Sequence, residues 1–220
     1  MSELRILVAD DNQFMRTAYK RILDTQDDFE VVGVASDGDE ALTMAIDLLP
    51  DVAVLDVRMP KKDGIAVAHY ITACDPQIGI VMISAYDDLA FVSAIMKNGA
   101  SRKAYILKNS LDDISELIRV VEAVAKGQAV LDGTIVQNLL AIYRRRTAAQ
   151  STPLTDTEEG VLQLMLEGYD ESEISQTLGL PLEPVEALAN SLCEKLGLGN
   201  QDGPNRSPQV VQALVNLCFP

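Results

Sequence analysis

The stretch of sequence that decides the fold is DVAVLDVRMP, which spans Asp51–Pro60. Its four apolar residues, Val52 to Leu55, follow one another without helical spacing, as in a strand buried on both faces of a parallel sheet. The run ends at Asp56, and Pro60 stops the strand from continuing. Open α/β sheets place their chemistry at the carboxyl ends of central strands. A lone aspartate at such a position is more often a turn residue, so its role has to be inferred from the residues that the fold places around it.

Strands and helices alternate strictly around this stretch, throughout residues 1–127. Such alternation implies right-handed crossovers and a doubly wound α/β fold with five parallel strands. Helices are expected at Gly64–Cys74 and at Asp87–Asn98. The last helix is expected to begin with Ser110 as its N-cap, with Asp113 three residues later. The predicted strands are Leu4–Ala9, Phe29–Ala35, Val52–Leu55, Ile78–Ile83 and Ala104–Leu107.

Polar side chains follow four of these strands, at the edge of the sheet where the strand ends meet. Because parallel strands end on one edge, we expect the five side chains to converge there. Carboxylates that lie close together raise one another's pKa unless a cation is bound, and hard oxygen ligands suit Mg²⁺. A lysine and a hydroxyl could then contact the oxygens of a phosphoryl group. The five residues are Asp10, Asp11, Asp56, Ser84 and Lys108.

The charge of the chain is strongly acidic, at −15 over 220 residues. Such acidity argues against non-specific binding to nucleic acid or to anionic membranes, because phosphate affinity comes mainly from clustered Lys and Arg. No apolar run approaches the ~20 residues of a membrane span, so we expect a soluble, cytoplasmic protein. Three widely spaced cysteines form no metal or disulfide pattern and are expected as thiols. The single histidine, His69, has no partner at ligand spacing and is expected at the surface.

Residues 1–127 resemble a CheY-like response-regulator receiver domain, which has a flavodoxin-like fold. The motifs that carry the resemblance are VADD at Val8–Asp11, VLDVRMPKKDG at Val54–Gly64, ISA at Ile83–Ala85 and YILK at Tyr105–Lys108. The resemblance implies that a sensor histidine kinase, or a phosphotransfer protein, donates a phosphoryl group to Asp56. It implies no enzyme activity beyond self-catalysed phosphoryl transfer and dephosphorylation, in which Lys108 and Ser84 would assist.

The resemblance also implies a metal site and a switch. Asp10, Asp11, Asp56 and the backbone carbonyl of Arg58 would hold Mg²⁺. Ser84 and Tyr105 would be the coupled switch pair, with the hydroxyl moving toward the phosphate as the aromatic ring turns inward.

The chain departs from the receiver pattern directly after Lys108. Receivers usually have a proline there, in a cis peptide, whereas this chain has Asn109. A cis bond before a residue other than proline costs about 2.5–4 kcal/mol. We therefore expect a trans bond and an altered loop, which bears on the placement of Lys108.

A connector and a second, helical domain follow the receiver-like part. Residues 128–150 are predicted to be a helical connector and linker, with a helix at Thr134–Arg146 whose three final arginines suit the negative end of the helix dipole. Residues 151–220 have purely helical spacing, with Thr155 and Glu158 as a capping box. Ser207-Pro208 has the N-cap-then-proline pattern of the last helix. The four helices are expected to start near Thr155, Glu171, Leu182 and Pro208.

Residues 151–220 resemble the LuxR-type helix-turn-helix domain of the NarL/FixJ response regulators, through LTDTEEGVLQLMLEG, EISQTLGL and CEKLGLGN. In that family the third helix enters the major groove with basic and polar residues. Here the candidate recognition helix carries Glu183, Glu186 and Leu188 instead. The domain holds eleven Asp and Glu but only two basic residues, Lys195 and Arg206, so little counterion release is available.

The sequence therefore predicts a response regulator switched by phosphorylation of Asp56. We expect its output domain to act through protein contacts or dimerisation rather than by ordinary DNA reading. Two alternatives stay open. One is a phosphorylation-dependent, DNA-binding transcriptional regulator, in which dimers compensate for weak half-site contacts. The other is a phosphate sink or adaptor in a phosphorelay.

Overall fold

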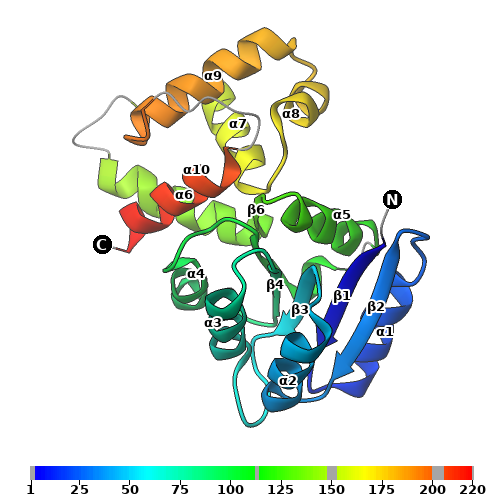
Figure 1. The fold of residues 1–220 in the computed structure, drawn as a ribbon. Helices are drawn as coiled ribbons and strands as arrows, with labels where there is room; N and C mark the ends of the chain where they lie inside the picture. Colours follow the sequence, from blue (N-terminus) through cyan, green and yellow to red (C-terminus); the bar gives the residue numbers. More distant parts are fainter. Residues whose placement is uncertain (1–2, 112–113, 148–152, 200–205, 220) are drawn as a thin grey trace.

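The structure of the protein is a computed structural model, which describes residues 3–111, 114–147, 153–199 and 206–219. Its first part is a parallel sheet in the order β2-β1-β3-β4-β5-β6, with helices on both faces (Figure 1). All six residues of β4 and all five of β3 are buried, because a central parallel strand is covered on both sides. The strands are β1 (Leu4–Ala9), β2 (Phe29–Ala35), β3 (Val52–Asp56), β4 (Gly79–Ser84), β5 (Lys103–Leu107) and β6 (Ala129–Leu131).

The helices of this part divide between the two faces of the sheet. Residues of α1 and α5 share one core with inward side chains of the central strands, and residues of α2, α3 and α4 share the other core. The alternation of inward side chains along each strand assigns neighbouring residues to opposite cores. The helices are α1 (Gln13–Leu23), α2 (Gly38–Leu48), α3 (Gly64–Cys74), α4 (Leu89–Met96) and α5 (Ile114–Ala125).

The predicted α/β fold is confirmed, but the predicted strand count of five is wrong. The sheet has a sixth strand, β6, which pairs in parallel with β5 through Lys103↔Ala129 and Tyr105↔Leu131. Residues 128–150 therefore begin as a strand rather than as a helical connector. β6 is only three residues long, too short to produce a periodic pattern, and it forms because β5 offers a free edge.

Two predicted helices in the first part also differ from the structure. Ser110 lies in a 3₁₀ turn, η1 (Lys108–Ser110), and the described part of α5 spans Ile114–Ala125. Asp113, the predicted partner of Ser110 in the cap of α5, lies outside the described residues. Helix α4 is shorter than predicted at both ends. Asp88 caps it by accepting the Ala90 N–H, which leaves Asp87 outside the helix, and the last helical residue is Met96.

The second part is a bundle of helices that continues the core of the first. Thr155 and Glu158 form the predicted capping box, and Gly179 ends α8 in a left-handed conformation, which glycine adopts readily. In Figure 1, α10 lies across α6, next to the end of the sheet that carries α4 and β6, whereas α9 lies farthest from the sheet. The helices are α6 (Gly133–Thr147), α7 (Asp156–Leu166), α8 (Glu171–Leu178), α9 (Leu182–Lys195) and α10 (Ser207–Cys218).

Contacts between the two parts are specific as well as apolar. Ser207, which the sequence suggested as an N-cap, lies inside α10, and its hydroxyl accepts a hydrogen bond from the Ala129 N–H of β6 at 3.0 Å. On the opposite side, the Arg119 guanidinium of α5 lies 4.5 Å from the ring centroid of Tyr169 and donates to the Glu167 carbonyl. The helical part is therefore held against both α5 and β6.

None of the helices in the described part of the chain combines the length and the apolarity needed to cross a bilayer.

Candidate functional site

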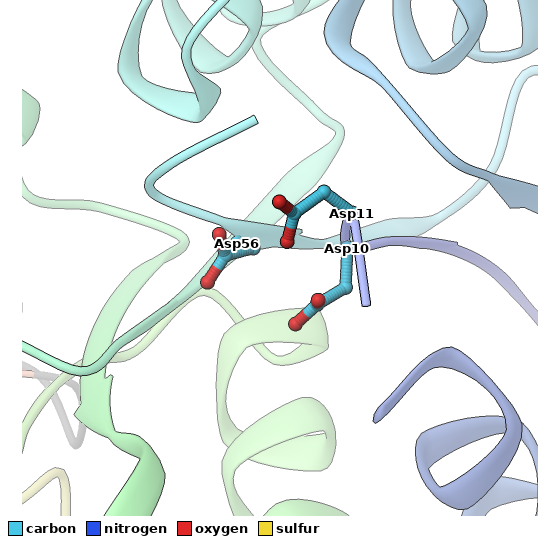
Figure 2. Close-up of side chains that lie close together, drawn as sticks. All are labelled: Asp10, Asp11 and Asp56. Carbon is cyan, nitrogen blue, oxygen red and sulfur yellow. The ribbon is translucent and has the colours of Figure 1, made fainter. Parts of the chain in front are cut away.

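Three carboxylates meet at the carboxyl edge of the sheet (Figure 2). Parallel pairing of β1 with β3, through Ala9↔Leu55, places the ends of these strands side by side. Oxygens of Asp10, Asp11 and Asp56 lie within 4.8 Å of one another. Asp10 and Asp56 are buried, whereas Asp11 is exposed. The structure therefore brings together the three acids that the sequence predicted to converge.

Lys108 crosses from the end of β5 to this acidic cluster. Its Nζ lies 2.8 Å from Asp10 Oδ2 and 2.7 Å from Asp56 Oδ1. Burial by itself would lower the pKa of Lys108, but the hydrogen bonds to Asp10 and Asp56 raise it above its ordinary value. The bond between Lys108 and Asn109 is trans, as predicted, and the loop forms the turn η1. The loss of proline therefore does not remove Lys108 from the site.

The electrostatics of Asp56 are set mainly by burial. Loss of water raises the pKa of its carboxyl, and Lys108 only partly opposes that rise. The second oxygen, Oδ2, accepts the Arg58 N–H at 2.9 Å. A bound cation would favour the ionised form further, since opposite charge lowers a carboxyl pKa. The arrangement thus suits a divalent cation together with an oxyanion.

The loops around the cluster are fixed by local hydrogen bonds. Asp10 Oδ1 accepts the Asn12 N–H, while Arg16 donates to the carbonyls of Asp10 and Asp11. Gly64, at the start of α3, lies so close to β3 that a Cβ would collide with the Asp56 carbonyl. These contacts hold the acids on rigid strand ends and leave Asp11 open to solvent.

Ser84 and Tyr105 are linked through a residue that the sequence analysis did not single out. The Ser84 hydroxyl accepts the Tyr86 N–H at 3.0 Å, and the Tyr105 hydroxyl donates to the Tyr86 carbonyl at 2.9 Å. Tyr105 is fully buried, and burial raises the pKa of its hydroxyl. The two predicted switch residues therefore bind the backbone N–H and the backbone carbonyl of the same residue, Tyr86, in the loop between β4 and α4.

The side chain of Arg58 lies on this same loop. Its guanidinium carbon is 5.8 Å from the ring centroid of Tyr86 and 5.3 Å from that of Phe91. The sequence predicted a role only for the Arg58 carbonyl. The available signal was a tyrosine two residues after Ser84 and a phenylalanine seven residues after it, since arginine commonly stacks on aromatic rings.

The acidic side chains predicted for the candidate recognition helix are exposed on α9. Glu183 and Glu186 face solvent, whereas Leu188 is half-buried at the margin of the core. Both basic residues of the helical domain have internal carboxylate partners. Lys195 Nζ lies 2.6 Å from Glu158, and Arg206 Nε lies 3.4 Å from Glu171.

His69 is not the surface residue that the sequence suggested. It is half-buried on α3, and burial lowers the pKa of its imidazole. It lies away from the acidic cluster, beside Lys103 near the opposite end of the sheet. Its position is consistent with the prediction that it takes no part in the site.

Comparisons with known proteins agree with this geometry. A family model for the response regulator receiver domain matches residues 6–126. The oxygen regulatory protein NreC of Staphylococcus aureus (strain MRSA252) is 32% identical over 203 residues, which cover 89% of this chain and 92% of NreC. The fold and the acidic site thus define a receiver domain that is joined to a helical output domain.

Solved structures extend the likeness along the chain. The signal receiver domain of NarL from Mycobacterium tuberculosis is 34% identical, with a TM-score of 0.54, and covers 58% of this chain and 100% of its own. RcsB of Salmonella typhimurium, at 23% identity and a TM-score of 0.57, covers 98% of both chains and supports the fold alone. The chain belongs to the two-component response regulators of the NarL/FixJ type. Response regulators are generally signalling proteins rather than enzymes.

Proposed function

We propose that Asp56 is the phosphoacceptor of this response regulator and that a sensor histidine kinase or a phosphotransfer protein is its donor. The observation that carries the proposal is the buried Asp56 carboxylate with the Lys108 ammonium at 2.7 Å. An oxygen of Asp56 attacks the phosphorus atom, the phosphorus–nitrogen bond of the donor phosphohistidine breaks, and its electron pair leaves with the imidazole. Lys108 is placed to contact an oxygen that gains charge during the transfer.

We propose that the carboxylates hold Mg²⁺. Three hard oxygen ligands, one of them exposed, fit a cation that prefers few protein ligands and retains water. Asp10, Asp11, Asp56 and the Arg58 carbonyl would hold it. When bound, the ion would neutralise charge on the phosphoryl oxygens. The residues of the chain position the acceptor, and Lys108 partly offsets the rise in the Asp56 pKa that burial causes.

In this proposal, Ser84 and Tyr105 are the residues that respond to phosphorylation of Asp56. The Ser84 hydroxyl exchanges its bond with Tyr86 for one with a phosphoryl oxygen, which frees one end of the loop between β4 and α4. Tyr105 continues to hold the other side of Tyr86 through the hydrogen bond from its hydroxyl to the Tyr86 carbonyl. The Arg58 side chain moves with Tyr86, because its guanidinium lies over the Tyr86 ring. Phosphorylation at Asp56 thus alters the surface in front of α4.

A phosphodonor experiment tests the acceptor assignment. The full chain is incubated with acetyl phosphate and Mg²⁺, and its intact mass is compared with that of Asp56→Asn. We expect one phosphoryl group on the wild type and none on the variant, with EDTA preventing the gain. Asp51→Asn is a matched control, because Asp51 precedes β3 at the other end of the strand. An unmodified wild type, or an equally modified Asp56→Asn, would refute the assignment.

We further propose that the output domain acts through protein contacts or dimerisation rather than by reading DNA sequence. Lys195 and Arg206 are engaged with carboxylates, and the outer face of α9 carries Glu183 and Glu186. Phosphates repel such a face, and few counterions would be released on contact. Of the three arginines that end α6, Arg144 pairs with Glu159.

The second candidate function is DNA binding by phosphorylated dimers, which the helix-turn-helix formed by α8 and α9 favours. RcsB is described as interacting with DNA. Binding of the beryllofluoride-treated full chain to a set of duplexes, measured between low and physiological salt, separates the two. We expect a slope of log affinity against log salt shallower than about −2. Converting both Glu183 and Glu186 to lysine should strengthen binding, which supplies a positive control. Nanomolar, sequence-specific binding by the wild type would favour the second candidate.

A further inference from the structure

Asp132 is a buried acid at the same edge of the sheet, and the proposed function does not use it. It follows β6 directly and is 4% exposed. Its N–H donates to the Tyr105 carbonyl at 2.9 Å, which continues the ladder between β5 and β6. Its Oδ2 accepts the Leu107 N–H at 3.1 Å, and its Oδ1 accepts the Thr134 N–H at 2.9 Å. One side chain therefore binds both the end of β5 and the start of α6.

These contacts fix the backbone from which Lys108 projects. Leu107 is the last residue of β5, and β6 is too short to provide a backbone acceptor beyond Tyr105. The Asp132 carboxylate fills that place. A carboxylate that accepts a backbone N–H makes a charge-assisted bond, which is stronger than a neutral one. The direction in which the chain leaves β5, and with it the reach of Lys108 to Asp56, depends on this contact.

The need for such a contact follows from the loop after Lys108. Asn109 leaves that peptide trans, and the chain turns at once into η1. Within this turn the Leu111 N–H bonds the Lys108 carbonyl at 3.4 Å, near the limit of a hydrogen bond. The turn alone is therefore a weak anchor for Lys108, whereas the bond from Leu107 to Asp132 lies one residue before it and is buried.

We propose that Asp132 is a positioning residue for Lys108: it holds the end of β5 so that the ammonium reaches Asp56. The proposal rests on the proposed function, in which Lys108 assists phosphoryl transfer. Asp132 touches neither the phosphoryl donor nor the acceptor, so its effect is transmitted through one backbone bond.

Two substitutions separate positioning from helix capping. Serine is as good an N-cap as aspartate, so Asp132→Ser keeps the cap of α6 while losing the bond to Leu107. Asp132→Ala loses both. We expect the rate of phosphorylation by acetyl phosphate at saturating Mg²⁺ to fall about tenfold in both variants, as for a barrier raised by about 1.4 kcal/mol. The thermal midpoint should fall markedly only in Asp132→Ala. In a Lys108→Met background, Asp132→Ser should cause no further loss of rate.

Two results would overturn the proposal. One is an Asp132→Ser variant with the wild-type rate beside a slow Asp132→Ala, because Asp132 would then be a helix cap only. The other is an unchanged Lys108 ammonium resonance in ¹⁵N-lysine spectra of Asp132→Ser, with Lys108→Met providing the assignment. The spectra do not require phosphorylation. If the wild type gained no phosphoryl group, the proposed function would fail while a shifted resonance still supported the positioning role.

Discussion

Replacing Lys108 with methionine removes the ammonium that bridges Asp10 and Asp56. The two acids are 0% and 5% exposed, and the lysine side chain is 23% exposed. Breaking a buried ion pair by removing one partner costs about 3–5 kcal/mol. The partial exposure of Lys108 weakens the interaction, so we expect a loss of about 2–3 kcal/mol in the free energy of unfolding at pH 7. For a chain of this size that loss corresponds to a thermal midpoint lower by roughly 5–10 °C.

The assay is urea unfolding followed by circular dichroism, in EDTA and again in Mg²⁺. A cation bound by the carboxylates replaces part of the lost charge, so Mg²⁺ should stabilise Lys108→Met more than the wild type. Lys20→Met is the control, because the Lys20–Asp24 pair is 44% exposed on both sides and should contribute less than about 1 kcal/mol. A Lys108→Met variant as stable as the control, with the wild-type response to Mg²⁺, would contradict the electrostatic account of the site.

Three further predictions concern other charged groups. Burial raises the pKa of Asp56, so the folded state binds its proton more tightly and the contribution of Asp56 to wild-type stability falls as pH rises above about 4. Unfolding at pH 4 and 7.5 should show Asp56→Asn gaining stability relative to the wild type as pH rises. Burial lowers the pKa of Lys103, whose Nζ donates to the Ile95 carbonyl, so Lys103→Met should be more stable by about 1 kcal/mol at pH 7, a difference that shrinks toward pH 10 in urea titrations. Arg119→Ala loses the contacts with Tyr169 and Glu167 and should cost about 1–2 kcal/mol of unfolding free energy, whereas Arg21→Ala on the surface should cost little.

The parts of the fold that sequence predicted well are those with strong local patterns. The apolar run before Asp56 and the alternation of strands and helices were sufficient to predict the parallel α/β fold. A strand that is apolar on both faces is typical of the centre of a parallel sheet. The acids and Lys108 could be predicted to converge because the ends of parallel strands share an edge. In these regions local pattern and tertiary structure agree.

The remaining features depend on contacts between distant residues. Strand β6 has no pattern of its own, and its formation requires the edge of β5. Ser207 resembles an N-cap, yet its hydroxyl accepts a bond from Ala129, 78 residues away. Likewise, nothing in the sequence pairs Lys195 with Glu158 or places Tyr86 between Ser84 and Tyr105. Such partners are set by packing, which overrides local preference.

The position of β6 has a consequence for the state in which the output helices leave the receiver. As the last strand of an open sheet, β6 has a second edge, and the Ser207 hydroxyl satisfies its Ala129 N–H. Gly168 covers the same edge so closely that a Cβ there would lie 2.6 Å from Val130 Cγ2. Separation of the two parts would leave a bare strand edge, which is a template for pairing with another chain. Release of the output domain would therefore also expose this strand edge on the receiver, and self-association through that edge would follow from opening.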